Sequence, residues 1–115
     1  MKSMDAKFFR NWQSQIRKGL LVLSILNDIS NRGMYGYEIE RKFRKSHGLF
    51  ISDGTIYRIL KRLKQRRLVK AAQIKSPDGP PRKYYKLTKT GRQTLSQMNA
   101  YWRAFSGQAS SIEKG

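Results

Sequence analysis

Hydrophobic residues recur at helical spacing over two stretches in the first half of the chain. The first runs from roughly Asn11 to Ile29, with an apolar residue every three or four positions, and predicts a long core helix. The second begins at Tyr37 and ends near the His47-Gly48 pair, where glycine suits a helix C-terminus. The segment between them, SNRGMYG, has the composition of a loop. This part of the chain therefore predicts two helices joined by a loop.

The clearest periodicity belongs to the next segment. Ser52 is a suitable helix N-cap, and Asp53 follows in the first turn, where the helix dipole favours a negative side chain. Apolar residues then fall at positions i, i+3, i+4 and i+7, which places them on one helical face. These residues are Ile56, Ile59, Leu60 and Leu63. The remaining side chains are mostly basic or polar, so the pattern predicts a helix with an apolar inner face and a cationic outer face.

After this helix the pattern becomes extended. Residues 68–75 and 82–88 are typical of strands, and the sequence SPDGPP between them is typical of a turn, so a two-stranded hairpin is expected. Thr88 can cap a last helix. Its large apolar residues are spaced three, four and three positions apart, which suits packing on a partner helix.

Basic residues greatly outnumber acidic ones in this chain. This excess indicates that the domain binds a polyanion. The 115 residues include 25 Lys and Arg against 7 Asp and Glu, a net charge of +18. Between Arg41 and Arg92 there are 17 basic and two acidic residues, and the basic positions alternate with apolar ones. The excess charge therefore lies on folded segments, and nucleic acid, acidic membrane surfaces and polyanionic proteins are the candidate partners.

The residues that most enzymes and metal sites need are scarce. The chain has no cysteine and a single histidine, His47. Glu38 and Glu40 are two positions apart on a predicted helix and so point in different directions. We therefore expect no catalysis, no cofactor and no bound metal. The longest apolar run, Leu20 to Leu26, is too short to span a bilayer, so a membrane association is not expected.

The order of the predicted elements is that of a winged helix-turn-helix, in which the third helix enters the major groove of DNA. The expected fold is mainly α with a small two-stranded β wing, plus N- and C-terminal dimerisation helices. We expect an N-terminal extension at residues 1–10, the DNA-binding domain at 11–88, a C-terminal dimerisation helix at 89–107 and a flexible tail at 108–115.

Several segments resemble the PadR-like transcriptional regulators, notably GLLVLSIL, YGYEI, GTIYRILKRL and GPPRKYYKLTKTGR. The resemblance covers most of residues 16–105. It implies a winged-helix domain, a homodimer held by the terminal helices and binding to operator DNA, usually as a repressor. One departure is Asp53, where relatives often carry proline. Both residue types suit a first helical turn, and we expect an acid near phosphates either to tune or to weaken the contact. In size and charge alone, the chain also resembles a small family member that modifies a circadian clock.

Candidate DNA contacts lie on the third helix, the wing and the start of the second helix. Arg58 is the first choice because arginine can pair with guanine through two hydrogen bonds. Basic residues of the wing would meet the DNA backbone or minor groove, and Tyr37 could donate to a phosphate. The predicted contact residues are Tyr37, Ser52, Thr55, Tyr57, Arg58, Lys61, Arg62, Gln65, Arg82 and Lys83.

Large apolar residues of the terminal helices are candidates for a dimer interface. They are Trp12, Leu95, Met98, Trp102 and Phe105. The same aromatic residues could instead line a cavity for a small aromatic effector between two protomers. Packing against the second copy is the simpler interpretation of an apolar seam on a terminal helix.

Two other functional classes are compatible with the charge. One is a basic RNA-binding or ribosome-associated protein, and the other is a module for acidic membranes or proteins. RNA-binding surfaces usually show stacking aromatic residues beside the basic face, whereas the third helix offers only Tyr57. The expected partner is therefore double-stranded promoter DNA with a near-palindromic sequence. The expected location is the nucleoid, in the cytoplasm of a prokaryotic cell.

Overall fold

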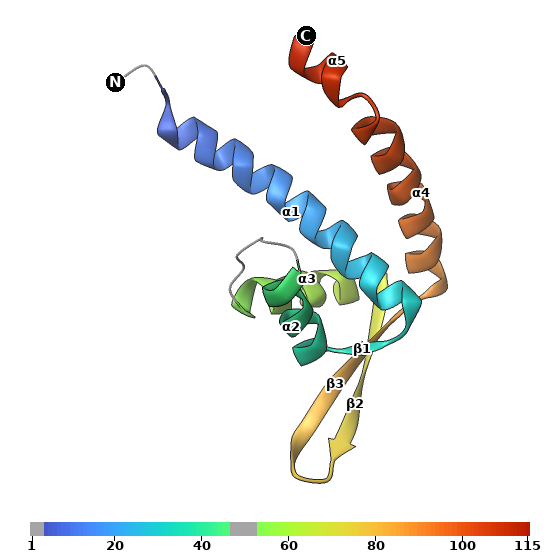
Figure 1. Ribbon diagram of the computed structural model, residues 1–115. Coiled ribbons are helices and arrows are strands. Elements are labelled where there is room, and N and C mark those ends of the chain that lie inside the picture. Colours follow the sequence, from blue (N-terminus) through green and yellow to red (C-terminus); the bar gives the residue numbers. More distant parts are fainter. Residues whose placement is uncertain (1–3, 47–52) are drawn as a thin grey trace.

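The computed structural model describes residues 4–46 and 53–115. Helices α1, α2 and α3 and a small sheet form the body, the hairpin of β2 and β3 projects from one end, and α4 and α5 extend towards the other (Figure 1). The elements are α1 (Ala6–Asn31), β1 (Met34–Tyr35), α2 (Gly36–Ser46), α3 (Asp53–Gln65), β2 (Val69–Ser76), β3 (Gly79–Leu87), α4 (Lys89–Ser106) and α5 (Ala109–Lys114). The predicted fold, a mainly helical winged helix-turn-helix, is confirmed.

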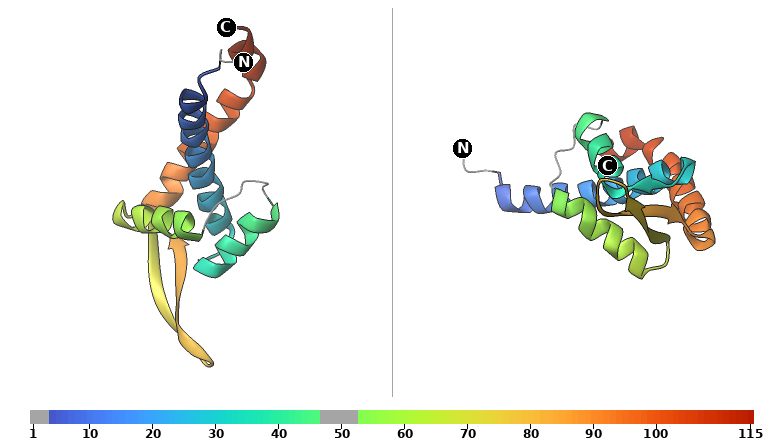
Figure 2. Two further views of the ribbon diagram at one scale, coloured as in Figure 1. Left: turned by 90° about the vertical axis from the view of Figure 1, so that its left-hand side faces the viewer. Right: turned by 90° about the horizontal axis from the view of Figure 1, so that it is seen from below.

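Helix α1 starts earlier than its periodicity predicted. Asp5 caps it by accepting a hydrogen bond from the backbone N–H of Phe8 at 3.0 Å, so the helix begins at Ala6, inside the expected N-terminal extension. Its buried residues all lie in its C-terminal part, from Leu21 to Ile29. The N-terminal half extends away from the rest of the molecule (Figures 1 and 2).

The sheet has three strands in the order β1-β3-β2, one more than predicted. The added strand, β1, pairs antiparallel with β3, with Met34 opposite Tyr85 and Tyr35 opposite Tyr84. The sequence predicted a loop here, because a strand of two residues beside glycine is too short to show alternation. The hairpin turns at Pro77 and Asp78, as the breaker-rich sequence indicated.

The core forms where α1, α2, α3 and the sheet meet. The predicted apolar face of α3 supplies Ile56, Leu60 and Leu63 to it, and all three are buried. Ile59 packs at its edge. The opposite face of α3 therefore has to face solvent or a partner.

Helix α4 is fixed to the body at its first turn. The Thr88 hydroxyl caps the helix by accepting from the N–H of Gly91 at 2.9 Å. Gly91 lies so close to the strand leading into β2 that a Cβ atom there would be 2.0 Å from the carbonyl oxygen of Leu68. Only glycine allows this approach.

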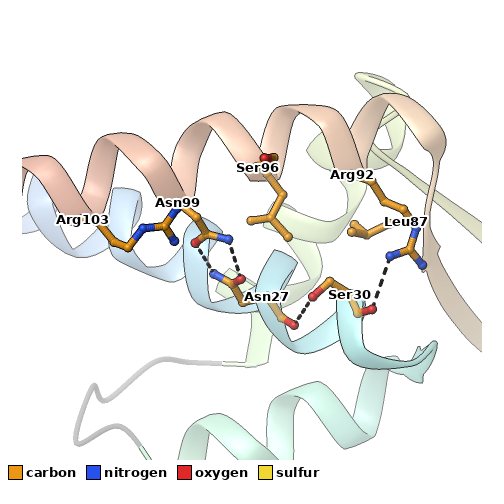
Figure 3. A pocket seen from close by; sticks show the side chains of 8 residues that line it. Asn27, Ser30, Leu87, Arg92, Ser96, Asn99 and Arg103 are labelled. Carbon is orange, nitrogen blue, oxygen red and sulfur yellow. Dashed lines mark hydrogen bonds between the residues drawn. The ribbon is translucent and has the colours of Figure 1, made fainter.

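An amide pair joins α1 to α4 about two turns further on. The side chains of Asn27 and Asn99 donate to each other at 3.0 and 2.9 Å (Figure 3). A cavity of about 290 Å³ lies beside them, where Arg92 donates to the backbone carbonyl of Ser30 at 3.4 Å. Beyond this pair the two helices diverge (Figure 1).

The end of the chain is helical where a flexible tail was expected. Residues 109–114 form α5, and all of its residues are exposed. Within the part of the chain that the structure describes, none of the helices combines the length and hydrophobicity needed to cross a membrane.

Candidate nucleic-acid interface

The outer face of α3 presents the basic side chains that the sequence predicted. Arg58, Lys61, Arg62 and Gln65 are all exposed. Thr55 is half-buried and accepts a hydrogen bond from Arg58 Nη2 at 3.3 Å, which orients the guanidinium along the helix. This face can therefore bring several donors to the edge of a DNA groove.

Two predicted contact residues do not join this face. Ser52 lies outside the described residues. Tyr57 lies on the flank of α3, where a Cβ added to Gly36 would be 3.0 Å from its ring. Tyr57 therefore packs over the start of α2, although its side chain remains 44% exposed.

The wing lies next to α3 because the chain turns sharply between them. Arg67 adopts φ 60°, and the N–H of Leu68 donates to the carbonyl of Leu63 at 3.0 Å, which ends the helix and starts β2. On β3, Arg82 and Lys83 are both exposed. The wing therefore starts directly after α3 and projects away from it (Figure 2).

Tyr37, in the first turn of α2, contacts the wing. Its ring is 5.0 Å from the guanidinium carbon of Arg82, and Arg82 Nη1 lies 3.4 Å from its hydroxyl oxygen. Arg41, which the sequence analysis missed, is 5.5 Å from the same ring. The available signal was its spacing, because residues i and i+4 share a helical face. The structure therefore brings two predicted contact residues, Tyr37 and Arg82, together and adds a second cation, Arg41.

Most of the interface charge is not neutralised within the chain. Among described side chains, the ion pairs join Lys42 to Asp28, Arg44 to Glu40 and Arg32 to Glu38. These pairs involve α1, α2 and the segment between them. None of the described cations of α3 or the wing forms an ion pair, so these elements carry an uncompensated positive charge.

Glu38 lies near Arg41, but both of its carboxylate oxygens are bonded to other groups. One of its carboxylate oxygens accepts from Arg32 Nη2 at 2.8 Å and the other from the N–H of Tyr35 at 2.9 Å. The hydrogen bond from Arg32 is the main reason that the pKa of Glu38 lies below its ordinary value. Glu38 therefore remains charged and anchors the start of α2 to the segment before β1.

A second surface is apolar and lies between α1 and α4. This groove has a volume of about 670 Å³ and contains three of the predicted dimer residues, Met98, Trp102 and Phe105. Trp12 lies on the projecting half of α1 and is 51% exposed. Leu95 is only 4% exposed and packs in the core of the single chain, so it has little surface left for a partner. The effector cavity suggested for these aromatic residues stays a prediction.

A pair of helices whose second member has a basic outer face, followed by a basic hairpin, defines a winged helix-turn-helix protein. The model of the PadR-like transcriptional regulator family matches residues 22–97. The chain belongs to this family, whose members are transcriptional regulators.

Solved structures and a sequence relative agree with this assignment. A PadR-like transcription factor from Bacteroides fragilis is 35% identical, with a TM-score of 0.76 over 89% of this chain and 98% of that chain. A PadR-like regulator from Bacillus cereus is also 35% identical, with a TM-score of 0.76 over 88% and 98%. An uncharacterized protein of Lysinibacillus sphaericus is 33% identical over 78% of this chain and 84% of its own length. These comparisons give no support to the resemblance to a clock protein.

Proposed function

We propose that the chain is a sequence-specific regulator that binds duplex DNA as a homodimer. In this proposal α3 enters the major groove, and the wing contacts the backbone or minor groove. The observation that carries it is the uncompensated cationic surface shared by α3 and the wing, because phosphate neutralisation supplies a large part of DNA affinity. Such a protein acts on the nucleoid, in the cytoplasm of a prokaryotic cell.

The apolar groove supports the dimer. Phe8, Trp12, Trp102 and Phe105 are between 42% and 71% exposed in the single chain. Large apolar side chains gathered on diverging helices mark an interaction surface. A two-fold dimer would cover them with the same residues of the second copy and would place two α3 helices on DNA about 34 Å apart.

Repression is the regulatory outcome that we propose. A dimer bound at a promoter obstructs polymerase by occupying the same DNA. A reporter gene under the control of the bound promoter should therefore become more active when the protein is removed, and lower reporter activity after removal would indicate an activator.

A salt titration of DNA affinity tests the proposal. The probes are duplex DNA from upstream of the protein's own gene and a scrambled duplex of equal length. We expect the upstream duplex to bind about a thousandfold more tightly at physiological salt. Both affinities should fall with salt, because binding releases counterions.

Single-stranded RNA of the same composition is the control for the alternative function. Tighter binding to RNA than to either duplex would favour an RNA-binding protein. Equal affinities for the two duplexes would contradict a specific site in this upstream region, and selection of bound genomic fragments would then show whether a specific site exists elsewhere.

A further inference from the structure

Three side chains at the junction of α2 and the wing form an arrangement that the fold does not need for its own stability. Arg41 comes from α2 and Arg82 from β3, and both guanidinium groups lie within 5.5 Å of the centroid of the Tyr37 ring. All three side chains are exposed. We refer to them as the Tyr37 cluster.

The Tyr37 ring is held in place by other aromatic rings. It stacks on Tyr35 with a centroid distance of 5.6 Å and an interplanar angle of 20°. The rings of Tyr35 and Tyr84 pack edge to face, with their centroids 4.9 Å apart. Because Tyr35 and Tyr84 are also opposite each other in the β1–β3 pair, the ring positions are tied to the backbone of the sheet. Tyr37 therefore gives the two exposed arginine side chains a ring whose position is fixed by the sheet.

Gathering two guanidinium groups at one ring costs electrostatic repulsion, which an acid would normally offset. No carboxylate among the described side chains forms an ion pair with Arg41 or Arg82. Glu38 and Glu40 are the acids nearest to the cluster in sequence. Glu40 pairs with Arg44, and the two oxygens of Glu38 accept from Arg32 and from the N–H of Tyr35, so Arg41 interacts with Glu38 through charge alone. The cluster thus has donors and positive charge available for an anion from outside the chain.

We propose that the Tyr37 cluster is a phosphate-binding site for the DNA backbone, with Arg41 and Arg82 as the binding residues and Tyr37 as the positioning residue. This inference rests on the proposed function and deepens it. The ring of Tyr37, rather than its hydroxyl group, supplies the essential interaction. The site places a cation of α2 and a cation of the wing on the phosphates of one strand, which sets the distance between wing and helix on DNA.

Substitutions at the three positions test this site on the duplex that the wild-type protein binds. Tyr37→Phe keeps the ring and should retain wild-type affinity. Tyr37→Leu removes the ring without changing the charge and should weaken binding about tenfold, because the two guanidinium groups lose the ring that positions them before DNA binds. Thermal unfolding of each variant, which should remain close to that of the wild type, checks that the fold is intact.

The arginine variants report on the phosphates directly. Arg41→Ala and Arg82→Ala should each reduce the slope of log affinity against log salt by about 0.9, because each removes one phosphate contact. Arg103→Ala is the matched control: it removes the same side chain from α4, towards the end of the molecule opposite the wing (Figure 1). Its salt slope should stay at the wild-type value.

Two results would overturn the site while leaving the proposed function intact. In the first, the wild-type protein binds duplex DNA and Arg41→Ala binds it with the same affinity and the same salt slope. The second is equal loss in Tyr37→Phe and Tyr37→Leu, which would assign the role to the hydroxyl group. Failure of the wild-type protein to bind duplex DNA at all would overturn both the proposed function and the site.

Discussion

Acidic side chains are few in this chain, and their positions decide which cations remain available for a partner. Asp28 and Glu40 neutralise Lys42 and Arg44 on α2. The basic residues described on α3 and the wing have no such partners among the described side chains. Charge compensation at the level of single residues therefore separates the structural face of the domain from its binding face.

The dependence of stability on pH tests the role of Glu38. Its folded-state pKa is lowered, chiefly by the hydrogen bond from Arg32, so it stabilises the fold above its ordinary pKa and loses this effect as pH falls through the folded value. Glu38→Gln should therefore lose less unfolding free energy than the wild type between about pH 6 and about pH 3. Urea denaturation across this range measures the difference. Glu113→Gln on α5 is the control, and parallel curves for Glu38→Gln and the wild type would contradict the prediction.

Arg58 tests base recognition by α3. Its side chain is exposed and oriented by Thr55, so Arg58→Ala should leave stability within about 0.5 kcal/mol of the wild type. Affinity for the specific duplex should fall by roughly 1 to 3 kcal/mol, and discrimination should relax at one base pair in each half-site. Competition binding with single-base variants of the duplex measures both effects. A uniform loss over all sequences would reassign Arg58 to the phosphate backbone.

At the scale of elements, α4 depends on one close approach. Gly91→Ala would place a methyl group against the Leu68 carbonyl and force the start of α4 away from the sheet. We expect a loss of about 1 to 3 kcal/mol in unfolding free energy, measured by urea denaturation.

Gly54→Ala in α3 is the matched control for this substitution. No atom lies within 4 Å of a Cβ built at Gly54, so the variant should be as stable as the wild type or more so, by up to about 1 kcal/mol. Equal stability of Gly91→Ala and the wild type would mean that the contact between α4 and the strand is not tight in solution.

Sequence periodicity predicted the elements whose hydrophobic pattern is long. The inner face of α3 is the clearest case, because Ile56, Leu60 and Leu63 are all buried where the spacing placed them. Strand β1 was missed because two residues cannot show a period. The start of α1 was placed too late because its first turns contact no other element, so apolar spacing does not mark where they begin.

The sequence predicted those parts of the candidate site that lie on a single helix or strand, but not the contacts between elements. The exposed residues of α3 follow from its own period, whereas the position of Arg41 beside Arg82 depends on where the wing folds over α2. The spacing of α3 placed Tyr57 at the flank of the helix, but its contact with the start of α2 could not be predicted from that spacing. Contacts between elements distant in sequence carry no periodic signal.

At the scale of the whole molecule, the wing extends from one end of the body and the diverging helices α1 and α4 from the other (Figure 1). Helix α3 lies between them, and Gly19 and Met98 line both the apolar groove and the neighbouring groove that Arg58 and Arg62 border. In the proposed dimer, a second copy packed on the outer parts of α1 and α4 would leave the wing uncovered.

Trp102 tests this arrangement. It lines the groove and is 42% exposed, so Trp102→Ala should remove a large apolar contact between copies and weaken dimerisation by about 2 kcal/mol or more. Sedimentation at several concentrations should show a shift towards monomer. Ile74→Ala, which shortens an exposed apolar residue on the wing, should sediment as the wild type does. An unchanged dimer in Trp102→Ala would place the interface elsewhere.

Footprinting of the bound promoter reports on the dimer, α3 and the wing in one experiment. We expect two protected half-sites related by a two-fold axis, with centres about one helical turn of DNA, roughly 34 Å, apart. Protection should disappear in Arg58→Ala at protein concentrations that protect fully with the wild type. Uniform protection without half-sites, or the same footprint in Arg58→Ala, would contradict a dimeric regulator that reads DNA through α3.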